Sequence, residues 1–143
     1  MTVREAAPGD AEGVAALLAE LGYPDDPGRV GRRLQRFSAE PSSFVLVAED
    51  GAGRVAGLTS ASVMPLLHEE GRWCRLSALV VGGRSRREGV GRALVAAVEE
   101  RAREAECRYL EVTSGERRER KAAHVFYAAL GLEEVSRRFL KEL

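Results

Sequence analysis

The stretch from Leu79 to Leu94 constrains the fold more than any other part of this sequence. An apolar run of strand type, 78–81, leads directly into a polar turn rich in glycine and arginine, and a helical pattern begins at Val90. A glycine-rich turn lets successive backbone N–H groups converge, and a helix N-terminus adds partial positive charge. The order strand, turn, helix therefore predicts a binding site for an anion such as a pyrophosphate.

Two glycines and several arginines strengthen this interpretation. Gly89 and Gly91 remove side chains that would block close approach of a ligand to the backbone. The local potential is raised by Arg84, Arg86, Arg87 and Arg92. A Walker loop would need a lysine here, and a dinucleotide fingerprint would need a small residue in place of Leu94. The competing interpretation is a turn that only reverses the chain, with exposed arginines.

The rest of the chain predicts an α+β fold with a mixed central sheet and flanking helices, in a single domain of residues 1–143. Expected helices, one of them capped by Asp10, cover about 10–22, a stretch from after Pro27 to about 38, a stretch from 90 to at least 103, and 121–131. The hairpin turn is expected at 50–53. The expected strands cover 2–6, 44–49, 54–64, 73–81, 109–113 and 132–140. A charged turn at 114–120 contains most of a basic run at 117–121, which we expect to be exposed or near a phosphate.

Composition excludes several classes of function. Lys plus Arg and Asp plus Glu both total 22, which argues against a nucleic-acid or anionic membrane partner. No stretch approaches the ~20 apolar residues of a membrane span, and the N-terminus lacks a signal-peptide pattern. Cys74 and Cys107 are expected to be reduced, which favours a cytoplasmic protein. His68 and His124 lack metal-ligand spacing, so no metal site is expected.

The segment Arg86-x-x-Gly89-x-Gly91 after an apolar strand resembles the acetyl-CoA-binding motif of the GNAT superfamily of N-acetyltransferases. The likeness covers nearly the whole chain. It includes the opening Arg4-Glu5-Ala6 with Asp10, the strand pair of 44–49 and 55–57, and the closing motif Ala123-x-x-Phe126-Tyr127-x-x-x-Gly131-Leu132. Four such motifs in the order of the family make the resemblance specific.

The resemblance implies acetyl-CoA as acyl donor and assigns roles to residues of this chain. Leu79 and Val81 would pair through their backbone with the pantetheine arm where the strands splay, and an amide near Val81 would polarise the thioester. Tyr127 would be the general acid for the CoA thiolate, although its helical stripe also suits a core residue. The implied cofactor-binding residues are Leu79, Val80, Val81, Arg86, Arg87, Glu88, Gly89, Val90, Gly91 and Arg92.

The general base is the least defined part of this picture. Many relatives carry a glutamate on the strand before the loop, where this chain has Leu76-Ser77-Ala78-Leu79. Ser77 is a poor base but can position a water. The alternatives are a water relay and the side chains of His68, Glu69, Glu70 and Glu111, of which the two adjacent glutamates could instead attract a cationic substrate.

The functional hypothesis is an N-acetyltransferase that moves acetyl directly from acetyl-CoA to a primary amine in a ternary complex. No nucleophile sits in a suitable setting for a covalent intermediate. Short substrate loops favour a small-molecule amine over a protein amine, and a homodimer is compatible with the family. The alternative is a non-catalytic acyl-CoA-binding or regulatory module, which the missing strand carboxylate supports. A nucleotide-binding protein that uses the same glycines is a third hypothesis.

Overall fold

The computed structural model describes residues 1–113, 121–136 and 138–143. It contains two compact units, Met1–Glu111 and Val112–Leu143. The expected charged turn at 114–120, with the arginines of the basic run, lies outside the described residues.

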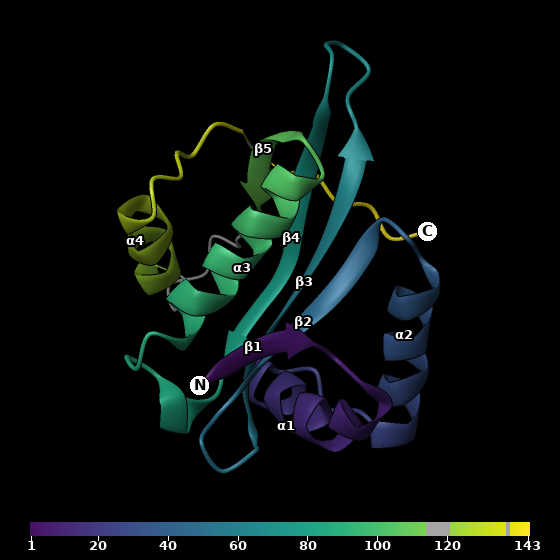
Figure 1. The fold of residues 1–143 in the computed structure, drawn as a ribbon, viewed down its shortest axis with the longest axis vertical. Coiled ribbons are helices and arrows are strands. Elements are labelled where there is room, and N and C mark those ends of the chain that lie inside the picture. Colours follow the sequence, from purple (N-terminus) through teal and green to yellow (C-terminus); the bar gives the residue numbers. More distant parts are fainter. Residues whose placement is uncertain (114–120, 137) are drawn as a thin grey trace. The chain divides into compact units, whose positions relative to one another are not determined.

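The first unit is built on a sheet whose order is β1-β2-β3-β4-β5 (Figure 1). Antiparallel ladders join the first four strands. Short turns connect β2 to β3 and β3 to β4, as the sequence predicted, whereas two helices lie between β1 and β2. The strands are β1 (Thr2–Glu5), β2 (Ser43–Glu49), β3 (Val55–Pro65), β4 (Arg72–Val81) and β5 (Cys107–Val112).

β5 runs parallel to β4, which makes the sheet mixed. The side chain of Arg108 lies against Gly71, and Glu111 further along β5 pairs with Arg75 further along β4. Both strands therefore advance in the same direction, which requires a crossover connection through a helix. The expected α+β class with a mixed sheet is confirmed.

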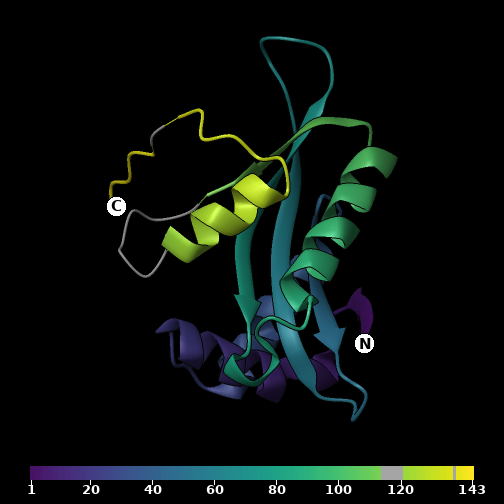
Figure 2. The same cartoon turned by 90° about the vertical axis from the view of Figure 1, so that its left-hand side faces the viewer.

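Three helices cover the two faces of this sheet (Figure 2): α1 (Ala11–Leu21), α2 (Pro27–Ala39) and α3 (Val90–Glu104). Leu58 packs in a buried cluster with residues of α1 and α2, including Leu17 and Val30. A Cβ at the neighbouring Gly57 would stand 2.8 Å from Val90 Cγ1, so this residue faces α3. Because successive strand residues point to opposite faces, α3 lies on the face opposite to α1 and α2.

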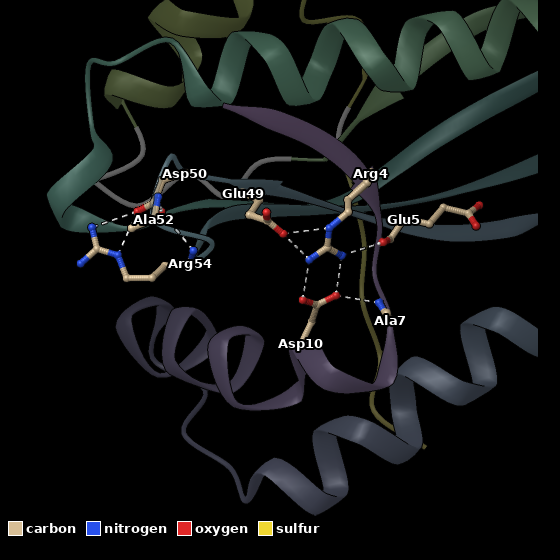
Figure 3. Close-up of polar contacts among 8 residues, drawn as sticks. All are labelled: Arg4, Glu5, Ala7, Asp10, Glu49, Asp50, Ala52 and Arg54. Carbon is tan, nitrogen blue, oxygen red and sulfur yellow. Dashed lines mark hydrogen bonds and ion pairs between the residues drawn. The ribbon is translucent and has the colours of Figure 1, made fainter.

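The entry to α1 differs from the prediction in one detail. Asp10 stands before α1, but its side chain does not cap that helix. Its carboxylate instead accepts from the backbone N–H of Ala7 at 2.6 Å and from both terminal nitrogens of Arg4 at 2.8 and 3.0 Å (Figure 3). Arg4 also donates to Glu49 at 2.7 Å, so one guanidinium links β1, β2 and the turn before α1. The Arg4 guanidinium outcompetes the amides of α1 for this carboxylate because its hydrogen bonds are charge-assisted.

The hairpin between β2 and β3 follows the expected chemistry. Asp50 Oδ1 accepts from the amides of Ala52 and Arg54 at 2.8 and 3.0 Å, as Figure 3 also shows. Gly53 adopts φ 78°, a left-handed conformation that glycine reaches without steric cost.

The second unit contains α4 (Lys121–Ala129). Gly131, with φ 86°, ends this helix, and the Leu132 amide donates to the Tyr127 carbonyl at 3.1 Å. The predicted strand over 132–140 is wrong for its described residues, 132–136 and 138–140, which form no strand. The apolar residues Val135, Phe139 and Leu140 do not alternate with polar ones, so the segment offers no single face to bury in a sheet, and all three are exposed.

None of the described helices combines the length and hydropathy that crossing a membrane requires.

Candidate cofactor-binding site

The turn between β4 and α3 has a backbone shape that exposes its amides. Gly82 is tied to β3 by a hydrogen bond from its amide to the Ala56 carbonyl at 2.9 Å, and a 3-10 turn, Gly83–Ser85, follows. Arg87 and Gly89 then adopt φ values of 69° and 82°. A left-handed conformation is uncommon for a residue with a side chain, and such strain concentrates at functional sites.

The first turn of α3 offers free N–H groups to a ligand. The first intrahelical bond runs from the Ala93 amide to the Gly89 carbonyl at 3.0 Å, so the amides of Val90, Gly91 and Arg92 have no partner within the helix. Gly89 at the N-cap has no side chain to cap them, and the first turn carries no acidic residue. The positive end of the 15-residue helix therefore stays open to an anion.

The charge of the loop suits the same ligand. Residues 82–92 contain four arginines and a single acid, Glu88. Within the described residues none of the four arginines forms an ion pair, and all are exposed: Arg84, Arg86, Arg87 and Arg92. The loop thus provides local positive potential in a chain with zero net charge.

Helix α1 fixes the start of the loop. The carboxylate of Glu20 accepts from the Gly83 amide at 2.9 Å. A Cβ at Gly82 would stand 3.0 Å from Leu17 Cδ2 and 3.3 Å from the Ala56 carbonyl oxygen, so α1 packs closely on the end of β4 at this residue. The sequence carried no signal for Glu20, because it is an ordinary exposed residue in the last turn of a helix.

The end of β4 presents an open edge. The Gly82 amide bonds to Ala56, and the antiparallel alternation then places Val80 in the next hydrogen-bonded pair, with Leu58. The N–H and C=O groups of Leu79 and Val81 consequently point away from β3. Val80, by contrast, is bonded towards β3 and is 6% exposed, so its side chain belongs to the core.

No strand of residues 1–111 covers this edge. β5 follows β4 only from Gly71 to Arg75 by its side-chain contacts, and it ends at Val112. From Ala78 onwards the outer edge of β4 is therefore free of β5. The structure brings this edge and the predicted loop together, because the edge runs directly into Gly82 and the turn.

The structure places three candidate bases away from the loop. His68, Glu69 and Glu70 lie in the hairpin before β4, so the ten residues of β4, about 30 Å of strand, separate them from the turn. Glu69 pairs with Arg108 at 3.3 Å, and its carboxylate raises the pKa of the adjacent Tyr109.

Glu111, the fourth candidate, lies beside the middle of β4. Its carboxylate accepts from two nitrogens of Arg75, at 3.0 and 3.2 Å. Both hydrogen bonds end on Glu111 Oε1, so this carboxylate already forms an ion pair with Arg75 on β4.

Tyr127 lies in the second unit, on α4. Its ring packs on Phe126 with centroids 5.6 Å apart and planes tilted by 57°, and it is half-buried. Its helix is the one predicted from the closing motif.

Neither cysteine has the setting of a nucleophile. Cys74 is fully buried and burial raises its pKa to about 11, while burial also raises the pKa of Cys107. Both thiols are free. Among the described residues no group of three or more His, Cys, Asp and Glu side chains could hold a metal ion.

Comparisons with known proteins identify the family and the fold of the chain. The acetyltransferase (GNAT) family model matches residues 12–132. A comparison with curated proteins found no match.

Several solved structures share the fold over nearly the full length of both chains. A GNAT family acetyltransferase from Staphylococcus aureus has a TM-score of 0.83 at 23% identity, covering 99% of this chain and 98% of that one. A transcriptional regulator from Bacillus halodurans has a TM-score of 0.88 at 22% identity, covering 99% of each chain. Glucosamine-6-phosphate N-acetyltransferase from Arabidopsis thaliana has a TM-score of 0.82 at 21% identity, covering 99% of this chain and 97% of that one.

The family model covers most of the chain, including the strand, loop and helix of the candidate site, and the chain therefore belongs to the GNAT family of acetyltransferases and is an N-acetyltransferase by class.

Proposed function

We propose that the protein binds acetyl-CoA on the β4 edge and the following loop, and transfers the acetyl group to a primary amine of a small molecule. The observation that carries this proposal is the uncapped start of α3, where the amides of Val90, Gly91 and Arg92 lack helical partners. Four arginines that form no ion pair with any described residue lie beside them. Free amides at a positive helix end are the donors that a pyrophosphate requires.

The residues present fit the rest of the cofactor. The backbone groups of Leu79 and Val81 face an edge that no strand of residues 1–111 covers, where they can pair with the amides of a pantetheine arm in the manner of an added strand. The amides of Arg86, Arg87, Glu88 and Gly89 extend the donor set of the helix start. The bound thioester supplies an activated acyl carbon, and an outward amide such as that of Val81 can stabilise its oxyanion.

Direct attack by the amine is the chemistry that these side chains support. A ping-pong route would need an activated thiol or similar nucleophile, and burial keeps Cys74 protonated and inaccessible. Following the family resemblance, we assign Tyr127 as the general acid that protonates the departing CoA thiolate. We place the reaction in the cytoplasm, where the free thiols of Cys74 and Cys107 stay reduced.

A small acceptor fits the loop between α1 and α2. A depression of about 420 Å³ lies there, lined by Leu18, Tyr23, Pro24, Asp25 and Arg33. The Asp25 carboxylate is already bonded to Arg33 at 2.7 Å, so this depression offers shape and polarity rather than an unpaired negative charge. The Arabidopsis neighbour is named for a small amino sugar, which agrees with an acceptor of this size.

The test is release of free thiol from acetyl-CoA in the presence of a panel of small amines. We expect turnover with at least one amine and a loss of about 10²-fold or more in kcat for Tyr127→Phe, the size expected when a general acid is removed. Binding of acetyl-CoA with no turnover for any small or peptide amine would favour a non-catalytic acyl-CoA-binding or regulatory module. Preference for ATP or NAD over acetyl-CoA would favour a nucleotide-binding protein.

A further inference from the structure

The register of β3 and β4 contains an irregularity at Ser77. Ser60 faces Ala78 and Ala61 faces Leu76, so Ser77 is an extra residue on β4 without a partner on β3. A bulge of this kind redirects a side chain and ends regular pairing, and bulges are over-represented next to active sites. Here it occurs immediately before the open edge of β4.

Two hydrogen bonds hold the Ser77 hydroxyl. Its Oγ lies 2.8 Å from Ser60 Oγ and 3.3 Å from the Ser60 carbonyl oxygen. On the other side of the bulge, Thr59 Oγ1 donates to the Ala78 carbonyl at 2.8 Å. Ser60 and Thr59 are 8% and 0% exposed, whereas Ser77 is exposed. The buried Ser60 thus holds the solvent-facing hydroxyl of Ser77 in place, and Thr59 fixes the backbone next to it.

The direction of these bonds determines what Ser77 can bind. A carbonyl only accepts, so both contacts are satisfied when Ser60 donates to Ser77 and Ser77 donates to the Ser60 carbonyl. Both hydroxyl protons then point inward. One lone pair of Ser77 Oγ is left for a ligand, which must therefore be a hydrogen-bond donor such as an amine N–H.

We propose that Ser77 is the residue that binds the nitrogen of the acceptor amine, with Ser60 as the residue that positions it. This assignment rests on the proposed acetyl transfer. Leu79, whose backbone faces the open edge, is two residues further on, about 7 Å along the strand. A nitrogen bound at Ser77 is thus close to the edge on which the thioester would lie.

The reaction balances without proton transfer to Ser77. The ammonium loses one proton to water, and the neutral amine attacks the thioester carbonyl carbon. The C–N bond forms, the C–S bond breaks and the electron pair of that bond leaves with the CoA sulfur. Nitrogen releases its second proton to water, and the sulfur takes one from the general acid. Ser77 only accepts an N–H hydrogen bond, so it orients the lone pair of the nitrogen towards the carbon.

The experiment measures kcat and KM for the best amine, together with acetyl-CoA affinity and melting temperature, in four variants. Ser77→Ala is expected to lower kcat/KM for the amine about tenfold, mainly through KM, with acetyl-CoA affinity unchanged. Ser77→Thr retains the hydroxyl and is expected to recover most of this loss. Ser60→Ala is expected to lower kcat/KM for the amine about threefold, because Ser77 loses one of the contacts that hold its hydroxyl.

Ser43→Ala is the matched control. Ser43 and Ser62 also form a hydroxyl pair 2.8 Å apart, but in a regular register pair without a bulge, so this change should leave kcat/KM unaffected.

Normal kinetics in Ser77→Ala would overturn the assignment while leaving the proposed function intact. A loss that Ser77→Thr does not recover, or one matched by weaker acetyl-CoA binding and lower stability, would identify a purely structural role and overturn it as well. No turnover by the wild-type protein with any amine would overturn the proposed function and this assignment together.

Discussion

Glu20 on α1 accepts a hydrogen bond from the backbone amide of Gly83, 2.9 Å away, at the start of the loop that begins the cofactor site. The two residues are 63 positions apart in the chain. This bond links the helix next to the α1–α2 depression to the loop that we assign to the pyrophosphate.

Removing this carboxylate should weaken cofactor binding more than it weakens the fold. In Glu20→Ala the exposed Gly83 amide can bond to water, so we expect a fall in melting temperature of only about 2 °C. The dissociation constant for acetyl-CoA should rise about threefold, because the start of the loop is no longer held. Calorimetric titration measures this, with Glu12→Gln on the exposed side of the same helix as the control. Equal effects of the two substitutions would contradict a role in positioning the loop.

Glycine should be required at position 89 because of the backbone conformation there, and not because a side chain would lack space. A Cβ at Gly89 would meet no atom within 4 Å, but the φ of 82° is unfavourable for alanine. Gly89→Ala should therefore lower the free energy of unfolding by about 1–2 kcal/mol. Gly51→Ala is the control, because Gly51 is equally unobstructed and has no positive φ. Urea denaturation compares the two, and a neutral Gly89→Ala would show that the loop does not hold this conformation.

Gly57→Ala should destabilise the protein because a side chain at this position lacks space, and not because of the backbone conformation. Its Cβ would stand 2.8 Å from Val90 Cγ1 and 3.0 Å from the Val80 carbonyl oxygen, which is backbone and cannot move freely. We expect a loss of about 1–3 kcal/mol in the free energy of unfolding, the usual cost of overpacking. Because Val90 begins α3, acetyl-CoA affinity should fall as well. Stability equal to that of Gly51→Ala would contradict the packing of α3 on β3.

The Arg4–Asp10 ion pair should make the stability of the protein depend on pH in the acidic range. The Arg4 guanidinium is the main cause that lowers the pKa of the Asp10 carboxyl. A carboxyl whose pKa is lower in the folded state than in the unfolded state stabilises the folded protein. This contribution is complete at pH values above the unfolded pKa of about 4, and it disappears as the pH falls through the folded pKa.

Asp10→Asn should lower the free energy of unfolding by about 1–3 kcal/mol at pH 7, since Arg4 loses its charged acceptor. The difference in free energy of unfolding between this variant and wild type should shrink below about pH 4. Denaturation curves at pH 7, 5 and 3 provide the measurement. Glu40→Gln, at an exposed carboxylate, is the control, and its difference in free energy of unfolding from wild type should not change with pH in this way. A constant difference for Asp10→Asn across this range would contradict the ion pair.

Direct transfer predicts that no acetyl group becomes attached to the protein. Burial raises the pKa of Cys74 to about 11, so its reactive thiolate is scarce at neutral pH. Intact-protein mass spectrometry after incubation with acetyl-CoA alone should show an unchanged mass. A stoichiometric acetyl adduct that an amine then discharges would contradict the ternary-complex mechanism.

The sequence predicted most of the fold and the place of the loop, because these depend on local patterns. The apolar strand before Gly82, the glycine-rich turn and the helix from Val90 follow from residue types within one short segment. The hairpin at Asp50 and the ends of α1 and α4 at glycines follow in the same way. By contrast, the expected strand at 132–140 rested on residue types alone, without the alternation that a sheet face requires.

The remaining features depend on partners distant in the chain. Asp10 had the residue type of a helix cap, but Arg4 and the Ala7 amide bind its carboxylate instead. The bulge at Ser77 depends on the register between two strands, which no spacing within either strand specifies. The position of Glu111 beside Arg75 likewise follows from the parallel packing of β5.

The most direct test of the central claim is a titration of the 15N-labelled protein with acetyl-CoA, followed by the shifts of its backbone amides. We predict saturable shifts that are largest for the amides of 86–92, with further shifts at Leu79 and Val81. CoA should reproduce the shifts in the loop, whereas ATP and NAD should not do so at equal concentration. Saturable binding that leaves the amides of 86–92 unshifted, or no binding of acetyl-CoA, would contradict the account.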